Sequence, residues 1–91
     1  MKITIVGGGN IGTQFAVHCA EKGHSVVIYT SSPDLFDGHL CIVDELGNIT
    51  HEGNILYATN DPSIAFKNAE LIIVTTPAMV MNSVSSLIYN L

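Results

Sequence analysis

Three glycines between a short apolar run and an amphipathic one constrain the fold of this chain more than any other feature. Gly7, Gly9 and Gly12 form the pattern G-x-G-x-x-G within GGGNIG. The preceding run KITIV at 2–6 is rich in β-branched residues, as in a short strand buried on both faces. Apolar and small residues then recur at helical spacing from 11 to 22. The sequence therefore predicts a strand, a tight turn and a helix in direct succession.

Each glycine has its own expected role in such a loop. Gly7 permits the tight turn, Gly9 lets the backbone approach a phosphate closely, and Gly12 lets the helix pack close to the strand. The free N–H groups of Asn10, Ile11 and Gly12, together with the positive end of the helix dipole, favour an anion. In this context the expected anion is the pyrophosphate of a dinucleotide. The alternative is that the glycines form only a strand-to-helix turn. The Asn10 side chain could contact a ligand or serve only as a helix cap.

The next segments indicate a second strand and a hairpin. The β-branched run at 25–30 predicts a strand parallel to the first, because a helix connects the two. Residues 39–60 contain two β-rich segments around the Gly-Asn pair at 47–48, which is a hairpin-turn signature. We expect a hairpin here in place of the usual second crossover helix.

The C-terminal third predicts two further helices with a strand between them. Asp61 as an N-cap and Pro62 at the first helical position predict a short helix through about Asn68, and a strand at 71–76 follows. The cap-and-proline device recurs at Thr76, and the apolar residues after it share one helix face: Val80, Val84, Leu87, Ile88 and Leu91.

This alternation of strands and helices predicts the α/β class. We expect a Rossmann-type, doubly wound, mostly parallel sheet with a β-hairpin replacing one crossover helix. Because the strand expected after the last helix is missing, residues 1–91 are interpreted as one truncated domain, the N-terminal part of a larger enzyme. The last helix face, if its usual cover is absent, predicts self-association into a homodimer.

Composition excludes several functions. The net charge is −5, with three lysines and no arginine, so we expect no nucleic-acid partner. The glycine-broken N-terminal run resembles neither a signal peptide nor a membrane span, and no membrane partner is expected. Cys19 and Cys41 show neither metal-ligand spacing nor a disulfide-rich pattern. These features predict a cytoplasmic protein.

No catalytic or metal-binding constellation is evident from spacing. The four histidines are His18, His24, His39 and His51. His18 is expected on the first helix, and His39 and His51 beside the hairpin, without ligand spacing, so we expect no metal site. No Ser/His/Asp or Cys/His nucleophile arrangement can be assembled, so no catalytic residue is assigned.

The end of the second strand leaves the cofactor type open. An acid that binds the adenosine ribose is expected about 20 residues past the loop, where the chain instead has Thr30, Ser31 and Ser32. Asp34 is the nearest acid and would need the loop to fold inward. The three hydroxyls could bind a 2′-phosphate, but no lysine or arginine lies nearby in sequence to balance its charge. The residues support a dinucleotide, NAD or NADP.

The motifs GGGNIG and TTPA, with the hydroxyl-ended second strand and the hairpin, resemble the N-terminal domain of the octopine/opine dehydrogenase family. The chain is also similar to ketopantoate reductases and glycerol-3-phosphate dehydrogenases. The resemblance implies a full-length NAD(P)-dependent enzyme acting on a 2-oxo acid or its amino-acid conjugate, with catalytic residues in a second domain. By itself this chain would then bind the cofactor without turnover.

The same resemblance implies roles for individual residues. The pyrophosphate would contact Gly7, Gly9, Asn10, Ile11 and Gly12, with Thr30 and Ser31 beside the adenosine ribose. Thr76, Pro77 and Ala78 would border the nicotinamide ribose. The alternative function is a nucleotide-sensing regulatory Rossmann module without catalysis. Such modules usually carry an acid after the second strand and a regular helix where this chain has a predicted hairpin, so both features favour the enzyme.

Overall fold

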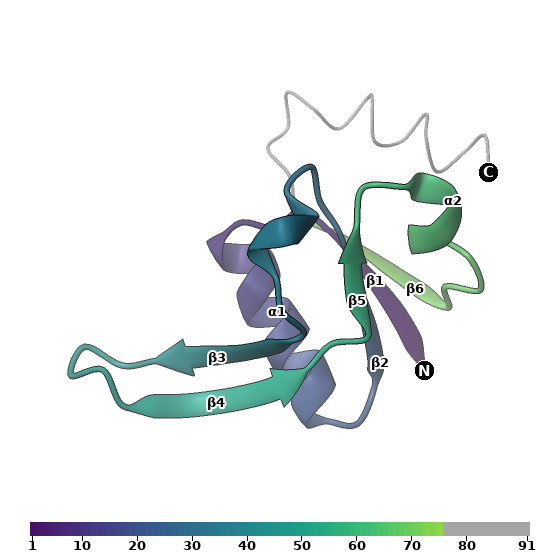
Figure 1. The fold of residues 1–91 in the computed structure, drawn as a ribbon. Coiled ribbons are helices and arrows are strands. Elements are labelled where there is room, and N and C mark those ends of the chain that lie inside the picture. The colour runs from purple at the N-terminus through teal and green to yellow at the C-terminus, as the bar shows by residue number, and fades with distance from the viewer. Residues whose placement is uncertain (76–91) are drawn as a thin grey trace.

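A four-stranded parallel sheet forms the centre of the domain (Figure 1). The structure is a computed structural model that describes residues 1–75. The strand order across the sheet is β5-β2-β1-β6, and each neighbouring pair is parallel. The strands are β1 (Lys2–Val6), β2 (Ser25–Tyr29), β5 (Tyr57–Thr59) and β6 (Leu71–Val74). This order matches one half of a doubly wound fold, so the predicted fold class is confirmed.

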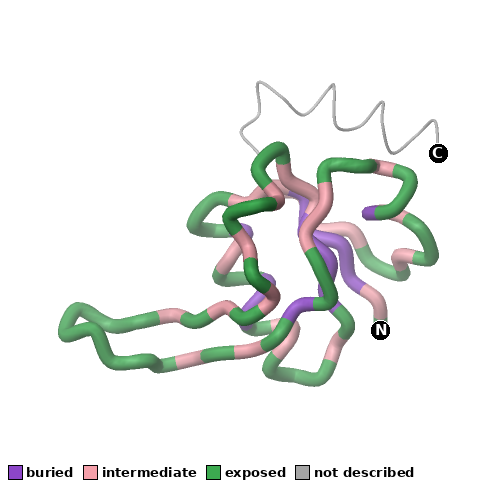
Figure 2. Tube along the Cα trace, in the orientation of Figure 1, coloured by how far each residue is buried: buried purple, intermediate pink, exposed green. Residues whose placement is uncertain are grey.

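Helix α1 (Asn10–Glu21) covers one face of this sheet and forms the main core with it. Alternate residues of a strand point to the same face, so β1 and β2 each present two side chains to the helix. The buried cluster, drawn among the purple segments of Figure 2, comprises Ile3, Ile5, Ala16, Val26, Ile28 and Ile55. Gly23 follows α1 with φ +89° and accommodates the left-handed turn into β2.

The opposite face of the sheet contacts the short helix α2 (Pro62–Ala65). Thr4 is fully buried, and its hydroxyl donates a 2.6 Å hydrogen bond to the carbonyl of Ala65. The Tyr29 and Phe66 rings pack with centroids 5.2 Å apart. These contacts fix α2 beside β1 and β2.

The predicted hairpin is present and consists of β3 (His39–Val43) and β4 (Ile49–Asn54). The 3-10 turn η1 (Pro33–Leu35) lies between β2 and this hairpin. Figure 1 shows the hairpin extending from the sheet, with its base beside α1. At this contact a Cβ on Gly53 would lie 2.8 Å from the Cβ of Ala20, so the β4 backbone approaches the helix closely.

The predicted end of the second helix is wrong, and the buried face of α1 does not follow hydrophobic spacing alone. The helix predicted through about Asn68 ends at Ala65, and Asn68 adopts a left-handed conformation with φ +60°, which a continuing helix does not allow. Ile11 and Phe15 have helical spacing but are exposed, because α1 turns Gly12, Ala16 and Val17 toward the sheet instead.

Strand β5 was not recognised as a separate element. Its three residues are too few for a periodic pattern, and the sequence analysis merged them with the second hairpin strand. The chain leaves the hairpin at buried Ile55 and joins the edge of the sheet, where the Leu56 N–H donates to the Val26 carbonyl at 2.8 Å.

The helix predicted after Thr76, with its apolar face at Val80, Val84, Leu87, Ile88 and Leu91, lies outside the described residues. Within residues 1–75, no helix has the length and apolar character needed to cross a bilayer.

Candidate functional site

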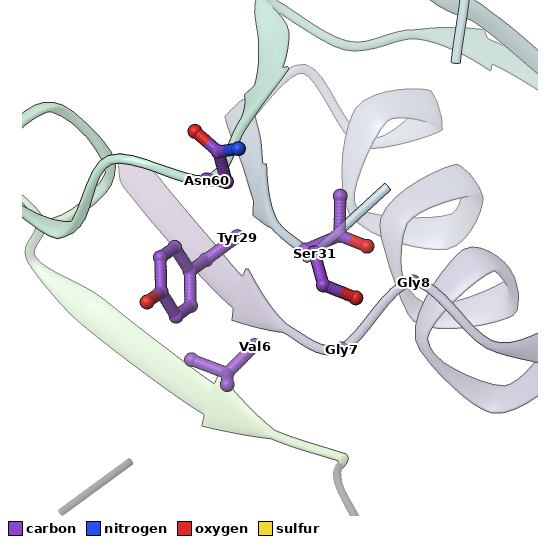
Figure 3. A pocket seen from close by; sticks show the side chains of 7 residues that line it. Val6, Gly7, Gly8, Tyr29, Ser31 and Asn60 are labelled. Atoms are coloured by element: carbon purple, nitrogen blue, oxygen red, sulfur yellow. The ribbon is translucent and has the colours of Figure 1, made fainter. Parts of the chain in front are cut away.

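A pocket of about 430 Å³ opens at the carboxyl ends of β1, β2 and β5. Figure 3 shows the Tyr29, Ser31 and Asn60 side chains that line it, with Gly7 on the loop that follows β1. The residues that line it are Val6, Gly7, Gly8, Tyr29, Thr30, Ser31 and Asn60. Ligands of open α/β sheets bind at this edge, and the volume is within the range of small-molecule sites. The structure thus brings together Gly7, Thr30 and Ser31, three of the residues assigned to the cofactor site from the sequence.

The first and last glycines of the motif have the structural roles expected from the sequence. Gly7 has φ +108°, and its N–H donates to the Tyr29 carbonyl at 2.9 Å, so the turn stays attached to β2. Gly12 is buried, and a Cβ there would lie 2.2 Å from the Gly7 carbonyl oxygen and 2.9 Å from Thr75 Oγ1. Only glycine allows the helix to lie this close to the loop.

Gly9 differs from its neighbours because a Cβ there would meet nothing within 4 Å. Its backbone has φ −77° and ψ −171°, which any residue adopts. Neither packing nor conformation among residues 1–75 therefore requires glycine at this position. An unobstructed approach to the backbone is what a bound pyrophosphate needs.

Gly8 occupies a variable position of the G-x-G-x-x-G pattern, so the pattern predicts no role for it. A Cβ on Gly8 would lie 2.8 Å from Thr30 Oγ1 and 3.1 Å from the Phe36 ring. Its lack of a side chain lets the end of β2 and the segment after η1 close over the loop. In the sequence, only the additional glycine in GGGNIG indicates that the chain is tightly packed at this position.

The start of α1 presents free backbone donors beside the loop. Gly9 is the N-cap without a side-chain cap, and the first helical bond runs from the Thr13 N–H to the Gly9 carbonyl at 2.9 Å. The N–H groups of Asn10, Ile11 and Gly12 precede that bond, and the first turn contains no acid. The cap hypothesis for Asn10 is wrong, because Asn10 is the first helical residue and its side chain is exposed.

Hydroxyl groups and an amide, rather than a carboxylate, border the pocket at the end of β2. The Thr30 N–H donates to the Thr59 carbonyl at 3.0 Å, and Thr30 Oγ1 accepts from the Ser32 N–H at 3.2 Å. Ser32 begins the turn into η1 and does not line the pocket. Asp34 is exposed on η1 and also lies outside the lining, so the loop does not fold this acid inward.

Asn60 is a pocket residue that the sequence analysis did not identify. It follows β5 directly, and the carboxyl ends of parallel strands meet at one edge of the sheet. Because β5 was not predicted, nothing indicated that Asn60 would reach the end of β2. The next residue, Asp61, is used locally: its carboxylate caps α2 and accepts hydrogen bonds from Ser63 N and Oγ at 3.0 and 2.7 Å. These bonds lower the pKa of Asp61.

The nicotinamide side of the predicted site is described only up to Thr75. This residue follows β6, and its N–H and hydroxyl both donate to the Val6 carbonyl, at 2.9 and 2.8 Å. The predicted residues Thr76, Pro77 and Ala78 lie outside the described residues.

The histidines are arranged differently from the sequence expectation. His39 and His51 lie within the hairpin strands and not beside them. His51 Nδ1 lies 3.0 Å from Glu21 Oε1, and the ring centroids of His51 and His18 are 4.8 Å apart. The fold therefore gathers residues that are 30 positions apart, and sequence spacing alone could not reveal this.

The parallel strand order, the glycine loop at the start of α1 and the pocket at the carboxyl edge define a Rossmann-type dinucleotide-binding domain. The family model for the N-terminus of NAD-dependent glycerol-3-phosphate dehydrogenase matches residues 2–91. The chain belongs to this family of dehydrogenase cofactor domains, and its cofactor is NAD(P).

Solved structures of octopine dehydrogenase have the same fold. The structure with NADH and L-arginine superposes with a TM-score of 0.75 at 24% sequence identity. The structure with NADH and pyruvate gives 0.74 at 26% identity. Both alignments cover 91% of this chain but only 24% of the octopine dehydrogenase chain, so this chain spans about a quarter of that enzyme's length. No curated protein sequence matches the chain.

Proposed function

We propose that this chain is the NADH-binding domain of a dehydrogenase that transfers hydride between the nicotinamide ring and a 2-oxo acid or its amino-acid conjugate. Residues 1–91 would form the cofactor domain, and a further domain of the full-length enzyme would supply the substrate site and the catalytic residues. The structures of octopine dehydrogenase with NADH and pyruvate or L-arginine support this substrate class. The cofactor carries the hydride, and the domain binds and orients it.

The observation that carries the proposal is the joint position of the pocket and the free helix terminus. The Gly9 backbone is unobstructed, and the first amides of α1 are not used in helical bonds. Donors at a helix N-terminus bind phosphate through hydrogen bonds and through the helix dipole. The pyrophosphate would lie on Gly9, Asn10, Ile11 and Gly12. The adenosine would extend into the pocket beside Thr30 and Ser31.

The proposed site differs from the sequence prediction at the end of β2 and keeps the predicted residues at the nicotinamide end. Ser32 lies outside the pocket lining and is left out of the proposed site, whereas Asn60 lines the pocket and its amide can hydrogen-bond the ribose hydroxyls. Thr76, Pro77 and Ala78 remain the proposed border of the nicotinamide ribose. Their place in the sequence, directly after the end of β6, supports this because β6 is adjacent to β1 in the sheet.

The distribution of charge favours NAD(H) over NADP(H). The chain has three cations among its lysine and arginine residues, and all three lie at the amino edge of the sheet. Lys2 begins β1, Lys22 precedes β2, and Lys67 precedes β6 and accepts a hydrogen bond from Lys2 Nζ on its carbonyl. A five-residue strand separates the two edges by about 15 Å. This distance exceeds the screening length of about 8 Å at physiological salt, so a 2′-phosphate in the pocket would lack a compensating charge.

The hairpin supports an enzyme over the regulatory alternative. Regulatory Rossmann modules usually carry a helix where this chain has β3 and β4, and an acid where it has Thr30 and Ser31. We also propose that the enzyme is cytoplasmic, in keeping with two free cysteines, and that it forms a homodimer through the predicted apolar face at 80–88.

Calorimetric titration of the chain with NADH and with NADPH tests the proposal. We expect NADH to bind more tightly. Ser31→Arg should tighten NADPH binding by about tenfold or more, because a charge-assisted hydrogen bond contributes about 1.5–3 kcal/mol. Ser25→Arg is the matched control, since Ser25 is exposed at the amino end of β2, the strand after which Ser31 follows.

The outcomes separate two parts of the proposal. Equal or tighter binding of NADPH by the unmodified chain would overturn the cofactor preference but not the dinucleotide site. An absence of binding with both cofactors would contradict the dinucleotide site itself. An equal response of Ser25→Arg and Ser31→Arg would show that general charge, and not the pocket, controls NADPH affinity.

A further inference from the structure

A cluster of three potential metal ligands lies where the hairpin meets α1. Ligand atoms of His18, Glu21 and His51 all lie within 4.8 Å of one another. His51 Nδ1 is 3.0 and 3.2 Å from the two carboxylate oxygens of Glu21, and His18 Nδ1 is 4.0 Å from Glu21 Oε1. The nitrogens of both imidazoles thus converge on one carboxylate.

Two independent features of the fold produce this convergence. His18 and Glu21 are three residues apart in the last turn of α1, and residues at this spacing share one helix face. His51 comes from β4, which is held against the helix where Gly53 meets Ala20. The arrangement is therefore built on a helix and a strand rather than on a loop, which favours a defined ligand geometry.

The distances between the three side chains are compatible with a shared transition-metal ion. Zn²⁺ binds imidazole nitrogen and carboxylate oxygen at about 2.0–2.2 Å, so neighbouring ligands of a tetrahedral ion lie about 3.3 Å apart. Glu21 and His51 already lie close to this spacing. The His18 nitrogen would have to approach Glu21 by about 0.7 Å, and its ligand atom lies within 4.8 Å of that of His51. Without an ion, His18 at 4.0 Å from Glu21 makes no hydrogen bond to it.

Charge and exposure at the cluster are compatible with a cation that keeps a water ligand. The side chains of His18, Glu21 and His51 are 50%, 34% and 44% exposed, so solvent can reach a fourth coordination position. The cluster lies at the C-terminal end of α1, where the helix dipole favours a positive charge. Two imidazoles and one carboxylate are also a ligand set that zinc uses in proteins with one open position.

We propose that His18, Glu21 and His51 form a surface site for a divalent transition-metal ion of the Zn²⁺ type, which links the hairpin to α1. We do not expect Mg²⁺ or Ca²⁺ to bind here, because these ions bind oxygen donors and two of the three side chains offer nitrogen. The site lies about 15 Å from the glycine loop, at the other end of α1. Metal binding and dinucleotide binding are therefore separate properties of the chain.

Titration of the tag-free, EDTA-treated chain with ZnCl₂ and with MgCl₂, followed by calorimetry, tests the site. We expect one Zn²⁺ per chain and no saturable heat with Mg²⁺. His18→Gln and His51→Gln should each weaken Zn²⁺ binding by about tenfold or more, because one of three protein ligands is lost. His39→Gln is the matched control: His39 lies on the neighbouring strand of the same hairpin, 3.6 Å from Glu52, outside the cluster.

Thermal unfolding of the same proteins with and without Zn²⁺ excludes a folding defect as the explanation. With Zn²⁺ at about a hundred times its Kd, the melting temperature of the unmodified chain and of His39→Gln should rise by about 10 °C or more. In His18→Gln and His51→Gln the rise at the same Zn²⁺ concentration should fall to about half or less, and their metal-free melting curves should show a cooperative unfolding transition. Absence of one-to-one Zn²⁺ binding, or equal loss in His39→Gln, would overturn the proposal.

Discussion

Two glycines of the motif, three positions apart, are predicted to respond to alanine in opposite ways. In Gly12→Ala the new methyl group would lie 2.2 Å from the Gly7 carbonyl oxygen, whereas ordinary contacts begin at 3.4 Å. The obstacle is backbone, so α1 must move away from the loop by about 1 Å. Overpacking of this kind costs about 1–3 kcal/mol, and alanine recovers up to about 1 kcal/mol through its higher helix propensity.

The expected net loss for Gly12→Ala is about 2 kcal/mol in the free energy of unfolding. For a domain of this size the loss lowers the melting temperature by about 8–16 °C. Gly9→Ala provides the matched comparison, because its methyl group meets nothing within 4 Å and its backbone conformation suits alanine. The weaker N-cap and the reduced entropy of the unfolded chain nearly cancel, so its stability should change by less than about 0.5 kcal/mol.

The variant with the smaller loss of stability, Gly9→Ala, should nevertheless lose NADH affinity. Gly9→Ala should retain its melting temperature yet weaken NADH binding by about tenfold or more, because its methyl group occupies the approach to the pyrophosphate. Circular dichroism melting and calorimetric titration measure the two effects. A melting temperature for Gly12→Ala within 2–3 °C of the unmodified chain, a shift of about 0.5 kcal/mol, would refute the packing argument. Undiminished NADH affinity in Gly9→Ala would refute the proposed position of the pyrophosphate.

Three further predictions concern the core, pH and thiol reactivity. Thr4→Val should lower the free energy of unfolding by about 1–3 kcal/mol in denaturant titrations, because it leaves a buried carbonyl of α2 without its donor. Hydrogen bonds from Ser63 lower the pKa of Asp61, so its stabilising effect should be present above the ordinary value of 3.8 and disappear as the pH falls through the lower folded-state value. The difference in melting temperature between Asp61→Ala and the unmodified chain should therefore be larger at pH 6 than at a pH below the folded-state pKa of Asp61. Burial raises the pKa of the Cys19 thiol, so iodoacetamide should modify exposed Cys41 first, and equal rates by mass spectrometry would contradict this.

Local sequence patterns were sufficient to predict the elements in the first half of the chain. The β-branched run at 2–6, the glycine spacing and the helix that follows specify β1, the loop and α1 because each depends on neighbouring residues. The hairpin was also predicted, since a Gly-Asn turn between β-rich segments is a local feature. The distance of about 20 residues between the glycine loop and Thr30, together with the family resemblance, was the basis for assigning Gly7, Thr30 and Ser31 to one predicted site.

The features that the sequence did not show depend on contacts between distant segments. Strand β5 has three residues and exists because it pairs with β2, and only that pairing brings Asn60 to the pocket. Ile11 and Phe15 are exposed because the face of α1 that packs on the sheet is set by Gly12 against the Gly7 carbonyl, and not by hydrophobic spacing alone.

The sequence by itself determined the order of the elements and the glycine loop, since these depend on backbone preferences over a few neighbouring residues. Only the tertiary structure decided which side chains from distant segments of the chain become neighbours. Glu21 and His51 are separated by 30 positions and become neighbours only because Gly53 lets β4 lie against α1. A close approach of this kind depends on the packing of two complete elements, and no spacing within either one encodes it.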